Sequence, residues 1–297
     1  MANSDIIGRF APSPTGPLHF GSLVCALASY LDVKSRGGQW LVRVEDIDPP
    51  REVAGSSDFI LRQLEAHGLH WDSKVLYQST RLDAYQEVLL ELQQRQLAYH
   101  CECSRKRLTS INGIYDERCR NLNLNSNGNA TRLCLSSESS LINFNDQIVG
   151  PIAHDLRLET GDFIIKRRDG LFSYQLAVTV DDQFQGVTHV MRGSDLLDST
   201  PKQIYLQHCL GYRKPTYAHL PIAVNSEGQK LSKQTKANHL MVGNEVNNCW
   251  QALHWLKQSP PPDLQHDTLD DLHQWALDNW ASNKITRSRL APAPHGF

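Results

Sequence analysis

Residues 6–36 read IIGRFAPSPTGPLHFGSLVCALASYLDVKSR. The segment Ile6–Phe10 predicts a short strand, and the proline- and glycine-rich stretch after it predicts a loop. Over Leu18–Arg36 apolar residues recur at helical spacing, and the pair Gly37-Gly38 ends that helix. Trp40–Val44 predicts a second strand. A strand, a helix and a second strand in this order are typical of a parallel sheet with helices on its faces.

The rest of the chain continues this alternation, apart from one break. The further elements we expect are helices at Ser57–Leu69, Asp83–Gln96 and Ser194–Leu210, with Pro201 an awkward residue in the last, and strands at Phe163–Lys166, Tyr174–Val180 and Thr188–Arg192. Residues 98–155 are rich in Cys, Asn and Ser and show little periodicity, which predicts an insertion. The sequence therefore predicts an α/β fold: a doubly wound parallel sheet with an insertion, followed by a short C-terminal helical segment in which Trp275, Leu277 and Trp280 belong to the core.

Composition excludes several classes of protein. The 297 residues are 40% hydrophobic and 21% charged, which allows a sizeable core and excludes wholesale disorder. A net charge of -2 excludes a generic polycation that coats nucleic acid. The longest apolar run, Leu23–Leu31, is shorter than the ~20 residues that span a bilayer, so we expect a cytoplasmic protein that does not enter a membrane. Seven cysteines, an odd number, argue against a secreted disulfide scaffold.

Two short motifs suit phosphate binding. His19 and Gly21 end the loop that joins the first strand to the first helix, a place where α/β folds bind anions. There His19 can donate to a phosphate oxygen, and Gly21 leaves room for a flat base. Lys230 and Lys233 lie close together and could neutralise a polyphosphate. Taken singly, the histidine also fits a plain surface turn and the lysines a solvated loop.

A third motif suits a metal ion. Cys101, Cys103 and Cys119 supply three thiolates for a tetrahedral zinc site. The fourth ligand is open: His100 is too close to Cys101 to close the same ring comfortably, and Cys134 is possible. A tyrosine ligand is unusual, because a phenol titrates near ~10 unless a metal lowers its pKa. Unrelated buried cysteines are the alternative.

In their order and separation, the two phosphate motifs resemble the HIGH and KMSKS signatures of class I aminoacyl-tRNA synthetases. The stretch RFAPSPTGPLH is similar to the glutamyl/glutaminyl branch of that family, and further matches occur at Val44–Asp48, Val180–Asp182, Met191–Leu197 and Ser199–Pro201. The resemblance implies a Rossmann-type catalytic domain. Two positions depart from the family pattern: Ser22 replaces the second histidine of HIGH, and Gln234 replaces the last serine of KMSKS.

The cysteine motif narrows the resemblance. Cys-x-Cys, 11 residues, Tyr115, 3 residues and Cys119 is similar to the zinc pattern of the glutamyl-Q tRNA(Asp) synthetase family, the truncated paralogues of glutamyl-tRNA synthetase. It favours one structural Zn²⁺ held by Cys101, Cys103, Tyr115 and Cys119. The implied domains are 1–97 and 156–215 for the two halves of the catalytic domain, 98–155 for the zinc-binding insertion, and 216–297 for the KMSKS-like loop and a helical tail, without an anticodon-binding domain.

This family activates L-glutamate with ATP in the absence of tRNA and transfers it to queuosine at the wobble position of tRNA(Asp). Its glutamate-binding residues correspond here to Arg9, Ala11, Ser13, Glu45, Tyr174 and Arg192. Its ATP-binding residues correspond to His19, Gly21, Ser22 and Lys233, with His19, Lys230 and Lys233 catalytic and Mg²⁺ on the phosphates. The resemblance implies a monomer whose partners are ATP, L-glutamate and tRNA(Asp) carrying queuosine.

The residue types suit these roles. Arg9 or Arg192 offers the planar cation that a carboxylate needs, and Glu45 suits an α-ammonium group. Tyr174 can donate or accept a hydrogen bond. Arg9 and Glu45 also lie at the ends of neighbouring predicted strands, so a plain ion pair between them is the alternative.

Other functions stay open on the sequence alone. One is a shortened glutamyl-tRNA synthetase that charges the tRNA 3′ end. Others are a nucleotidylyltransferase that acts on a small acid without RNA, and a non-enzymatic RNA-binding module. A basic cluster near the cysteines suits either anticodon phosphates or a solvated surface; it comprises Arg105, Lys106, Arg107, Arg118 and Arg120.

The change Lys233→Ala tests the KMSKS-like motif. We expect glutamate-dependent ATP–pyrophosphate exchange to fall on the order of a hundredfold, because the lysine stabilises charge on the departing pyrophosphate. The melting temperature should not change. Both quantities are measured on one preparation, and a parallel loss of the two would make the lysine structural.

Overall fold

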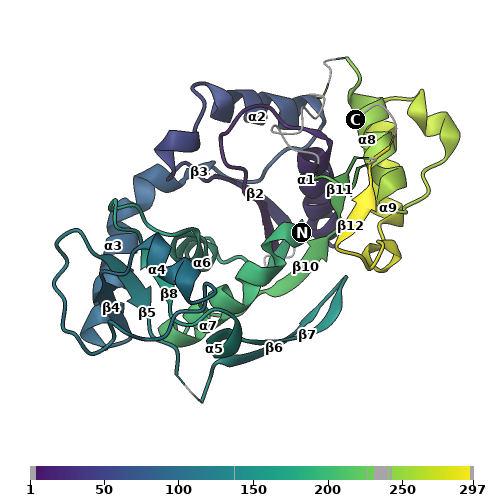
Figure 1. Ribbon diagram of the computed structural model, residues 1–297. Helices are drawn as coiled ribbons and strands as arrows, with labels where there is room; N and C mark the ends of the chain where they lie inside the picture. The colour runs from purple at the N-terminus through teal and green to yellow at the C-terminus, as the bar shows by residue number, and fades with distance from the viewer. Residues whose placement is uncertain (1–4, 137, 226, 231–239, 241–242, 295–297) are drawn as a thin grey trace.

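The computed structural model of the protein describes residues 5–136, 138–225, 227–230, 240 and 243–294. Its centre is a five-stranded sheet in which every neighbouring pair of strands is parallel (Figure 1). Across the sheet the order is β10 (Thr216–Leu220), β9 (His189–Gly193), β1 (Ile7–Phe10), β2 (Gln39–Val44) and β3 (Leu76–Tyr77). Three of these strands, β1, β2 and β9, were predicted from the sequence.

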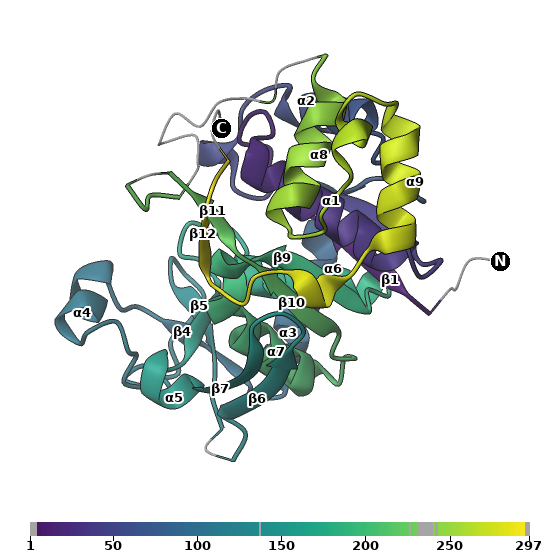
Figure 2. The ribbon, with the colours of Figure 1, turned by 90° about the vertical axis from the view of Figure 1, so that its right-hand side faces the viewer.

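Helices cover both faces of this sheet. One face shares a hydrophobic cluster with α1 (Phe20–Lys34), α2 (Ser56–Ala66), α8 (Glu245–Trp255) and α9 (Leu269–Asn279). The other face shares a second cluster with α3 (Leu82–Gln94), α6 (Tyr174–Phe184) and α7 (Thr200–Leu210). Figure 2 shows α8 and α9 beside α1. The doubly wound α/β fold is therefore confirmed.

The first helix packs very closely on the first strand. A Cβ added at Gly8 would lie only 2.7 Å from Val33 Cγ1, so only glycine allows this approach. The structure also contains short 3₁₀ turns at Pro49–Arg51, Gln78–Arg81, Ser194–Ser199, Pro262–Gln265 and Ser282–Lys284.

The insertion contains more regular structure than its sequence indicates. An antiparallel sheet joins β4 (Ala98–Cys101), β5 (Ala130–Leu133) and β8 (Phe163–Lys166), with α4 (Arg105–Ser110) beyond it. A hairpin follows, of β6 (Leu141–Asp146) and β7 (Gly150–Asp155), and then α5 (Leu156–Glu159). The predicted strand at 163–166 is confirmed, but it lies in this sheet and not in the central one.

One predicted strand is wrong. Residues 174–180 were expected to be extended, but they form the first part of α6. Ser173 caps this helix by accepting a hydrogen bond from the backbone N–H of Leu176 at 3.3 Å. The β-branched residues Val178, Thr179 and Val180 favour a strand locally, and burial between the sheet and α3 overrides that preference.

Two other expectations need correction. The segment 194–210 is not one helix: a 3₁₀ turn precedes α7, and Pro201 lies in the first turn of α7, where its missing N–H costs nothing. The tail is not wholly helical either, because β12 (Leu290–Pro292) pairs in parallel with β11 (Ile222–Val224).

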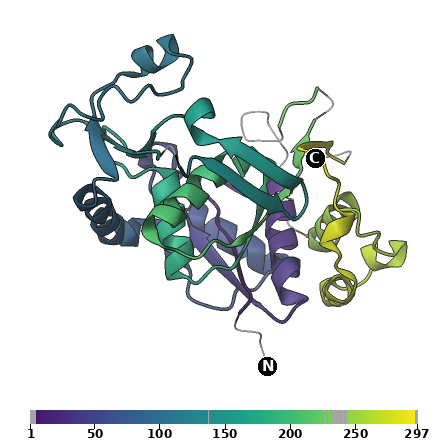
Figure 3. The ribbon, with the colours of Figure 1, turned by 90° about the horizontal axis from the view of Figure 1, so that it is seen from below.

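The expected helical tail is otherwise present, and Trp275, Leu277 and Trp280 pack against the core. Figure 3 shows the tail on the opposite side of the molecule from the part of the insertion that contains β4 and α4. Within the described ranges, no helix is both long and apolar enough to cross a membrane.

Candidate active site

A cavity of about 330 Å³ lies where the strand order reverses, at the carboxyl ends of β1 and β9. This switch point is where open α/β sheets bind ligands. The cavity brings together predicted site residues from distant parts of the chain: Arg9, Ala11, Ser13, His19, Gly21, Ser22, Tyr174, Arg192 and Lys230. Glu45 lies next door, in a pocket of about 430 Å³ that shares Ser13 and Tyr174 with it. Lys233 and Gln234 fall outside the described residues.

His19 is the N-cap of α1. Its Nδ1 accepts a hydrogen bond from the backbone N–H of Ser22 at 3.3 Å, which fixes the ring at the helix N-terminus. A Cβ at Gly21 would lie 3.2 Å from His19 Cε1. Glycine at 21 therefore keeps room for the histidine ring as well as for a ligand.

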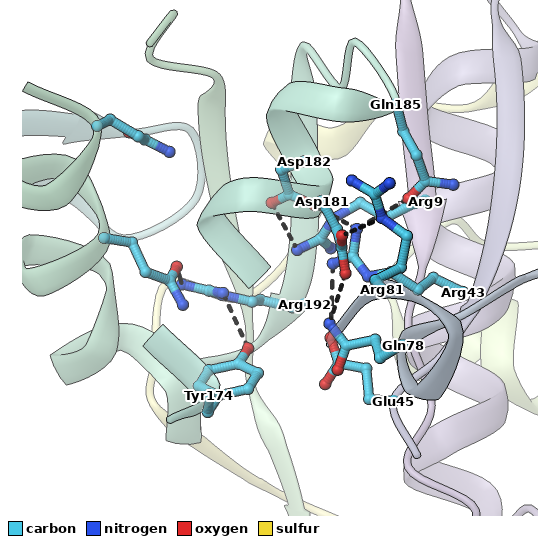
Figure 4. A network of polar contacts seen from close by, with 12 residues as sticks. Arg9, Arg43, Glu45, Gln78, Arg81, Tyr174, Asp181, Asp182, Gln185 and Arg192 are labelled. Carbon is cyan, nitrogen blue, oxygen red and sulfur yellow. Dashed lines mark hydrogen bonds and ion pairs between the residues drawn. The ribbon is translucent and has the colours of Figure 1, made fainter. Parts of the chain in front are cut away.

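Arg9 and Arg43 share one buried carboxylate (Figure 4). Arg9 Nε donates to Asp182 Oδ1 at 3.0 Å, and Arg43 Nη1 donates to the same oxygen at 2.8 Å. Arg43 also reaches Glu45 Oε1 at 3.5 Å. The structure thus pairs Arg9 with Asp182 and not with Glu45. The motif Val180–Asp182 contains Asp182, but nothing in the sequence shows which residues it joins.

Its neighbour Asp181 anchors the same helix elsewhere. The Asp181 carboxylate is fully buried and accepts hydrogen bonds from Gln78 Nε2 at 2.9 Å, Arg81 Nε at 3.1 Å and Tyr85 Oη at 2.5 Å. Adjacent carboxylates on α6 therefore tie it to β1 and β2 on one side and to α3 on the other. This fixes the position of Tyr174 at the start of α6.

Arg192 is held in a different way. It donates to Tyr174 Oη at 3.2 Å, Thr200 Oγ1 at 2.7 Å, Gln203 Oε1 at 2.8 Å and His219 Nε2 at 3.2 Å. Among the described residues, no carboxylate lies within ion-pair distance of it. Arg192 is therefore a cavity arginine whose charge is not already balanced by an adjacent carboxylate.

Burial shifts the pKa of two site residues. Burial raises the pKa of Glu45, although Arg43 and Arg9 act against that shift. Burial also raises the pKa of Tyr174, so its phenol stays protonated at neutral pH. Because Tyr174 Oη accepts from Arg192, its own proton can be donated into the cavity.

Lys230 closes one side of the cavity. It forms an ion pair with Asp195, which follows β9 and also lines the cavity. Cys25 lies nearby, and burial raises its pKa to about 12, so its thiol stays protonated. The cavity therefore joins the two predicted phosphate motifs through described residues, His19 and Lys230.

The three cysteines of the insertion meet as a metal site requires. The sulfurs of Cys101, Cys103 and Cys119 all lie within 4.8 Å of one another, and Cys103 Sγ is 3.5 Å from Cys119 Sγ. In a tetrahedron with Zn–S bonds of about 2.3 Å, sulfurs are roughly 3.8 Å apart. The cluster thus fits a tetrahedral zinc ion.

The Tyr115 hydroxyl lies beside two of the three sulfurs. Its Oη lies 3.5 Å from Cys101 Sγ and 3.9 Å from Cys103 Sγ. Burial raises the pKa of Tyr115, so a phenolate here needs a cation beside it. The His100 ring instead contacts Gln93 and Thr131, and within the described ranges Cys134 is not part of the cluster. The geometry favours Tyr115 among the three alternatives.

Arg132 is a residue of this site that the sequence analysis missed. Its guanidinium lies 3.8 Å above the Tyr115 ring, and its Nε donates to Cys101 Sγ at 3.1 Å. Burial opposes ionisation of Cys101, yet hydrogen bonds from Tyr115 and Arg132 lower its pKa. A cation of this kind offsets the negative charge of several thiolates. No motif marks Arg132, because strand pairing alone brings it to the cluster.

Two arginines of the basic cluster form ion pairs within the protein. Arg107 pairs with Asp116 at 2.6 Å, and Arg120 pairs with the buried Asp162 at 2.5 Å. These two arginines therefore stabilise the insertion. Arg105 lines the pocket that contains Glu45.

Comparisons with known proteins agree with this geometry. The model of the family "tRNA synthetases class I (E and Q), catalytic domain" matches residues 5–255. The structure is similar to a crystal structure of glutamate-tRNA synthetase from Elizabethkingia anophelis, with a TM-score of 0.80 and 25% identity over 98% of this chain and 68% of that one. A glutamate tRNA ligase from Elizabethkingia meningosepticum in complex with its amino acid gives 0.79, at 25% identity over 98% and 67%. Fold and site thus define a class I tRNA synthetase domain.

Curated relatives narrow the class. The glutamyl-Q tRNA(Asp) synthetase of Klebsiella pneumoniae (strain 342) is 48% identical over 99% of both chains. That of Escherichia coli (strain K12) is 48% identical over 98% of this chain and 94% of its own. The chain therefore belongs to the glutamyl-Q tRNA(Asp) synthetase family of class I tRNA synthetases.

The change Cys119→Ser tests the metal site. We expect the wild-type protein to contain one zinc per chain and the variant to lose most of it, because a hydroxyl is a poor replacement for a thiolate. Metal analysis after exhaustive dialysis measures this. Cys134→Ser, outside the cluster, is the control and should keep its zinc. A variant at 119 with full zinc content would exclude that cysteine as a ligand.

The change Gly161→Ala tests how the backbone places Tyr115. Gly161 has a φ of +68°, and a Cβ there would lie 2.2 Å from the Tyr115 carbonyl oxygen. We expect a loss of about 1–3 kcal/mol in the free energy of unfolding, together with weaker zinc retention. Gly128→Ala is matched in backbone strain, with a φ of +64°, but a Cβ there meets nothing within 4 Å. Equal zinc retention in both variants would contradict the prediction.

Proposed function

We propose that this protein activates L-glutamate with ATP, without tRNA, and transfers the glutamyl group to the cyclopentenediol of queuosine at the wobble position of tRNA(Asp). The observation that carries the proposal is the single cavity at the switch point. It is lined by His19 and Lys230 for a triphosphate and by Arg192 and Tyr174 for an amino acid. The names of relatives 48% identical over nearly the whole chain supply the acceptor.

Carboxylate recognition falls chiefly to Arg192. Asp182 already balances Arg9, whereas Arg192 meets only neutral partners among the described residues. A carboxylate of glutamate would complete its set of charges. Glu45 lies in the adjoining pocket, which shares Ser13 and Tyr174 with the cavity, and it suits the α-ammonium group. Ala11 and Ser13 line the cavity itself.

In the first step an oxygen of the α-carboxylate attacks the α-phosphorus of ATP. The bond to the bridging oxygen breaks, and pyrophosphate leaves with the electron pair. No proton has to move, so the protein's work is alignment and charge stabilisation. The groups proposed for the phosphates are His19, held at the N-terminus of α1, with Lys230 and Lys233, and Mg²⁺ bound with ATP would supply further positive charge there.

In the second step a hydroxyl of the queuosine diol attacks the acyl carbon of the mixed anhydride. The ester bond forms, the acyl–phosphate bond breaks, AMP leaves with the electron pair of that bond, and the hydroxyl proton passes to the departing phosphate. A vicinal diol of this kind is similar to the terminal ribose of tRNA, so one catalytic centre suits either acceptor. The substrates place the reaction in the cytoplasm.

Zinc is proposed to be structural. It would be held by Cys101, Cys103, Tyr115 and Cys119. None of these four residues lines the cavity. When bound, it would fasten the loop between β4 and β5.

The decisive experiment supplies the enzyme with ATP, labelled glutamate and tRNA(Asp) that has or lacks queuosine. We expect label on the tRNA only when queuosine is present, and glutamate-dependent ATP–pyrophosphate exchange without any tRNA. Nuclease mapping should locate the ester in the anticodon loop. Label on the terminal adenosine would instead show charging of the 3′ end, and exchange without any transfer would show a nucleotidylyltransferase.

A further inference from the structure

Arg192 has a buried histidine as its neighbour in the sheet. The parallel register of β9 and β10 places His219 beside Arg192, and Arg192 Nε lies 3.2 Å from His219 Nε2. The exposed fractions are 5% for Arg192 and 0% for His219. A guanidinium N–H can only donate, so His219 Nε2 has to accept. The ring proton of a neutral His219 therefore lies on Nδ1.

That proton points at Asp146. Asp146 ends β6, and its Oδ2 lies 2.6 Å from His219 Nδ1. Its other oxygen, Oδ1, accepts backbone N–H groups from Ile148 at 3.0 Å, Val149 at 2.9 Å and His219 at 3.1 Å. With both oxygens engaged and the side chain fully buried, the carboxylate has one orientation.

The charges along this chain of contacts follow from burial and bonding. Burial acts to raise the pKa of Asp146, but the hydrogen bonds from His219 and the backbone lower it overall, so Asp146 is ionised. Burial lowers the pKa of His219, with Arg192 adding to the shift and Asp146 opposing it, so the ring is neutral. The chain is thus a carboxylate, a neutral imidazole and a guanidinium.

We infer that Asp146 and His219 are positioning residues that set the orientation of Arg192 for a carboxylate of the substrate. The inference rests on the proposed function. It assigns a part in the active site to the β6–β7 hairpin, which lies beside β10 and supplies none of the cavity's lining residues.

The physical reason is that the His219 ring separates Asp146 from Arg192. A carboxylate in direct contact with Arg192 would balance its charge, as Asp182 balances that of Arg9, and would therefore compete with a substrate carboxylate. The imidazole transmits the orientation of Asp146 and leaves the guanidinium in contact with neutral groups. A carboxylate that orients a functional group through histidine is also the usual arrangement behind metal ligands.

The change Asp146→Asn tests this. An amide cannot accept both from the backbone N–H groups and from His219, so the imidazole is driven to its other tautomer and presents an N–H to Arg192. We expect the KM for glutamate in ATP–pyrophosphate exchange to rise on the order of ten- to a hundredfold. The KM for ATP should change less than about twofold. Asn145→Ala, exposed on the same strand, is the control and should leave both unchanged.

Two further variants separate positioning from folding. His219→Asn keeps a donor near the Nδ1 position but loses the acceptor for Arg192, so it should raise the KM for glutamate even if Asp146→Asn folds poorly. In an Arg192→Lys background, Asp146→Asn should add little, because its effect passes through the guanidinium.

Each outcome decides the matter. A selective rise in the glutamate KM that disappears in the Arg192→Lys background supports the inference. Additive effects, or a parallel loss for glutamate and ATP together with a lower melting temperature, would overturn it and make the pair structural. If the wild-type chain neither binds glutamate nor shows exchange, the proposed function fails as well, and that result is distinct from a normal wild type with a silent Asp146→Asn.

Discussion

The site depends on one buried carboxylate, Asp182, between two arginines from neighbouring strands. Removing Asp182 would leave the buried Arg9 guanidinium without its ion-pair partner, at a cost of about 3–5 kcal/mol. The positions of the three side chains therefore depend on one another, and together they tie α6 to β1 and β2. Because Tyr174 is the first residue of α6, the contacts of Asp182 also fix one wall of the cavity.

The same balance explains why two arginines that line one cavity differ. Arg9 is in direct contact with its counter-charge, Asp182, so it contributes mainly to the shape of the cavity and to a fixed electrostatic potential. Arg192 has its nearest counter-charge one imidazole away, at Asp146, so the proposed substrate carboxylate would gain a full charge-assisted contact there. If Arg192 binds the substrate as proposed, the cavity would discriminate against the corresponding neutral amide, since the amide would leave the charge of Arg192 unbalanced.

The sequence predicts what is local. The strand, loop and helix over residues 6–36 carry their own periodicity and stop signals, and the motifs within them mark the cavity. It could not predict α6, because valine and threonine favour strands until burial decides. Nor could it find Asp146 and His219, which are 73 residues apart and meet only because a hairpin lies along an edge strand. Arg132 was missed for the same reason.

The cysteine cluster and the cavity are connected through β8. Arg132, which contacts Cys101 and Tyr115, also donates to the backbone carbonyl of Asp162 at 2.5 Å, at the start of β8. At its other end β8 accepts the backbone N–H of Ser173 at Ile165, 3.0 Å away, and Ser173 caps α6 directly before Tyr174. Packed strands transmit displacement because they have few alternative arrangements. Order at the cysteine cluster thus bears on the position of Tyr174 in the wall of the cavity, which is the structural role that the proposed zinc ion would have.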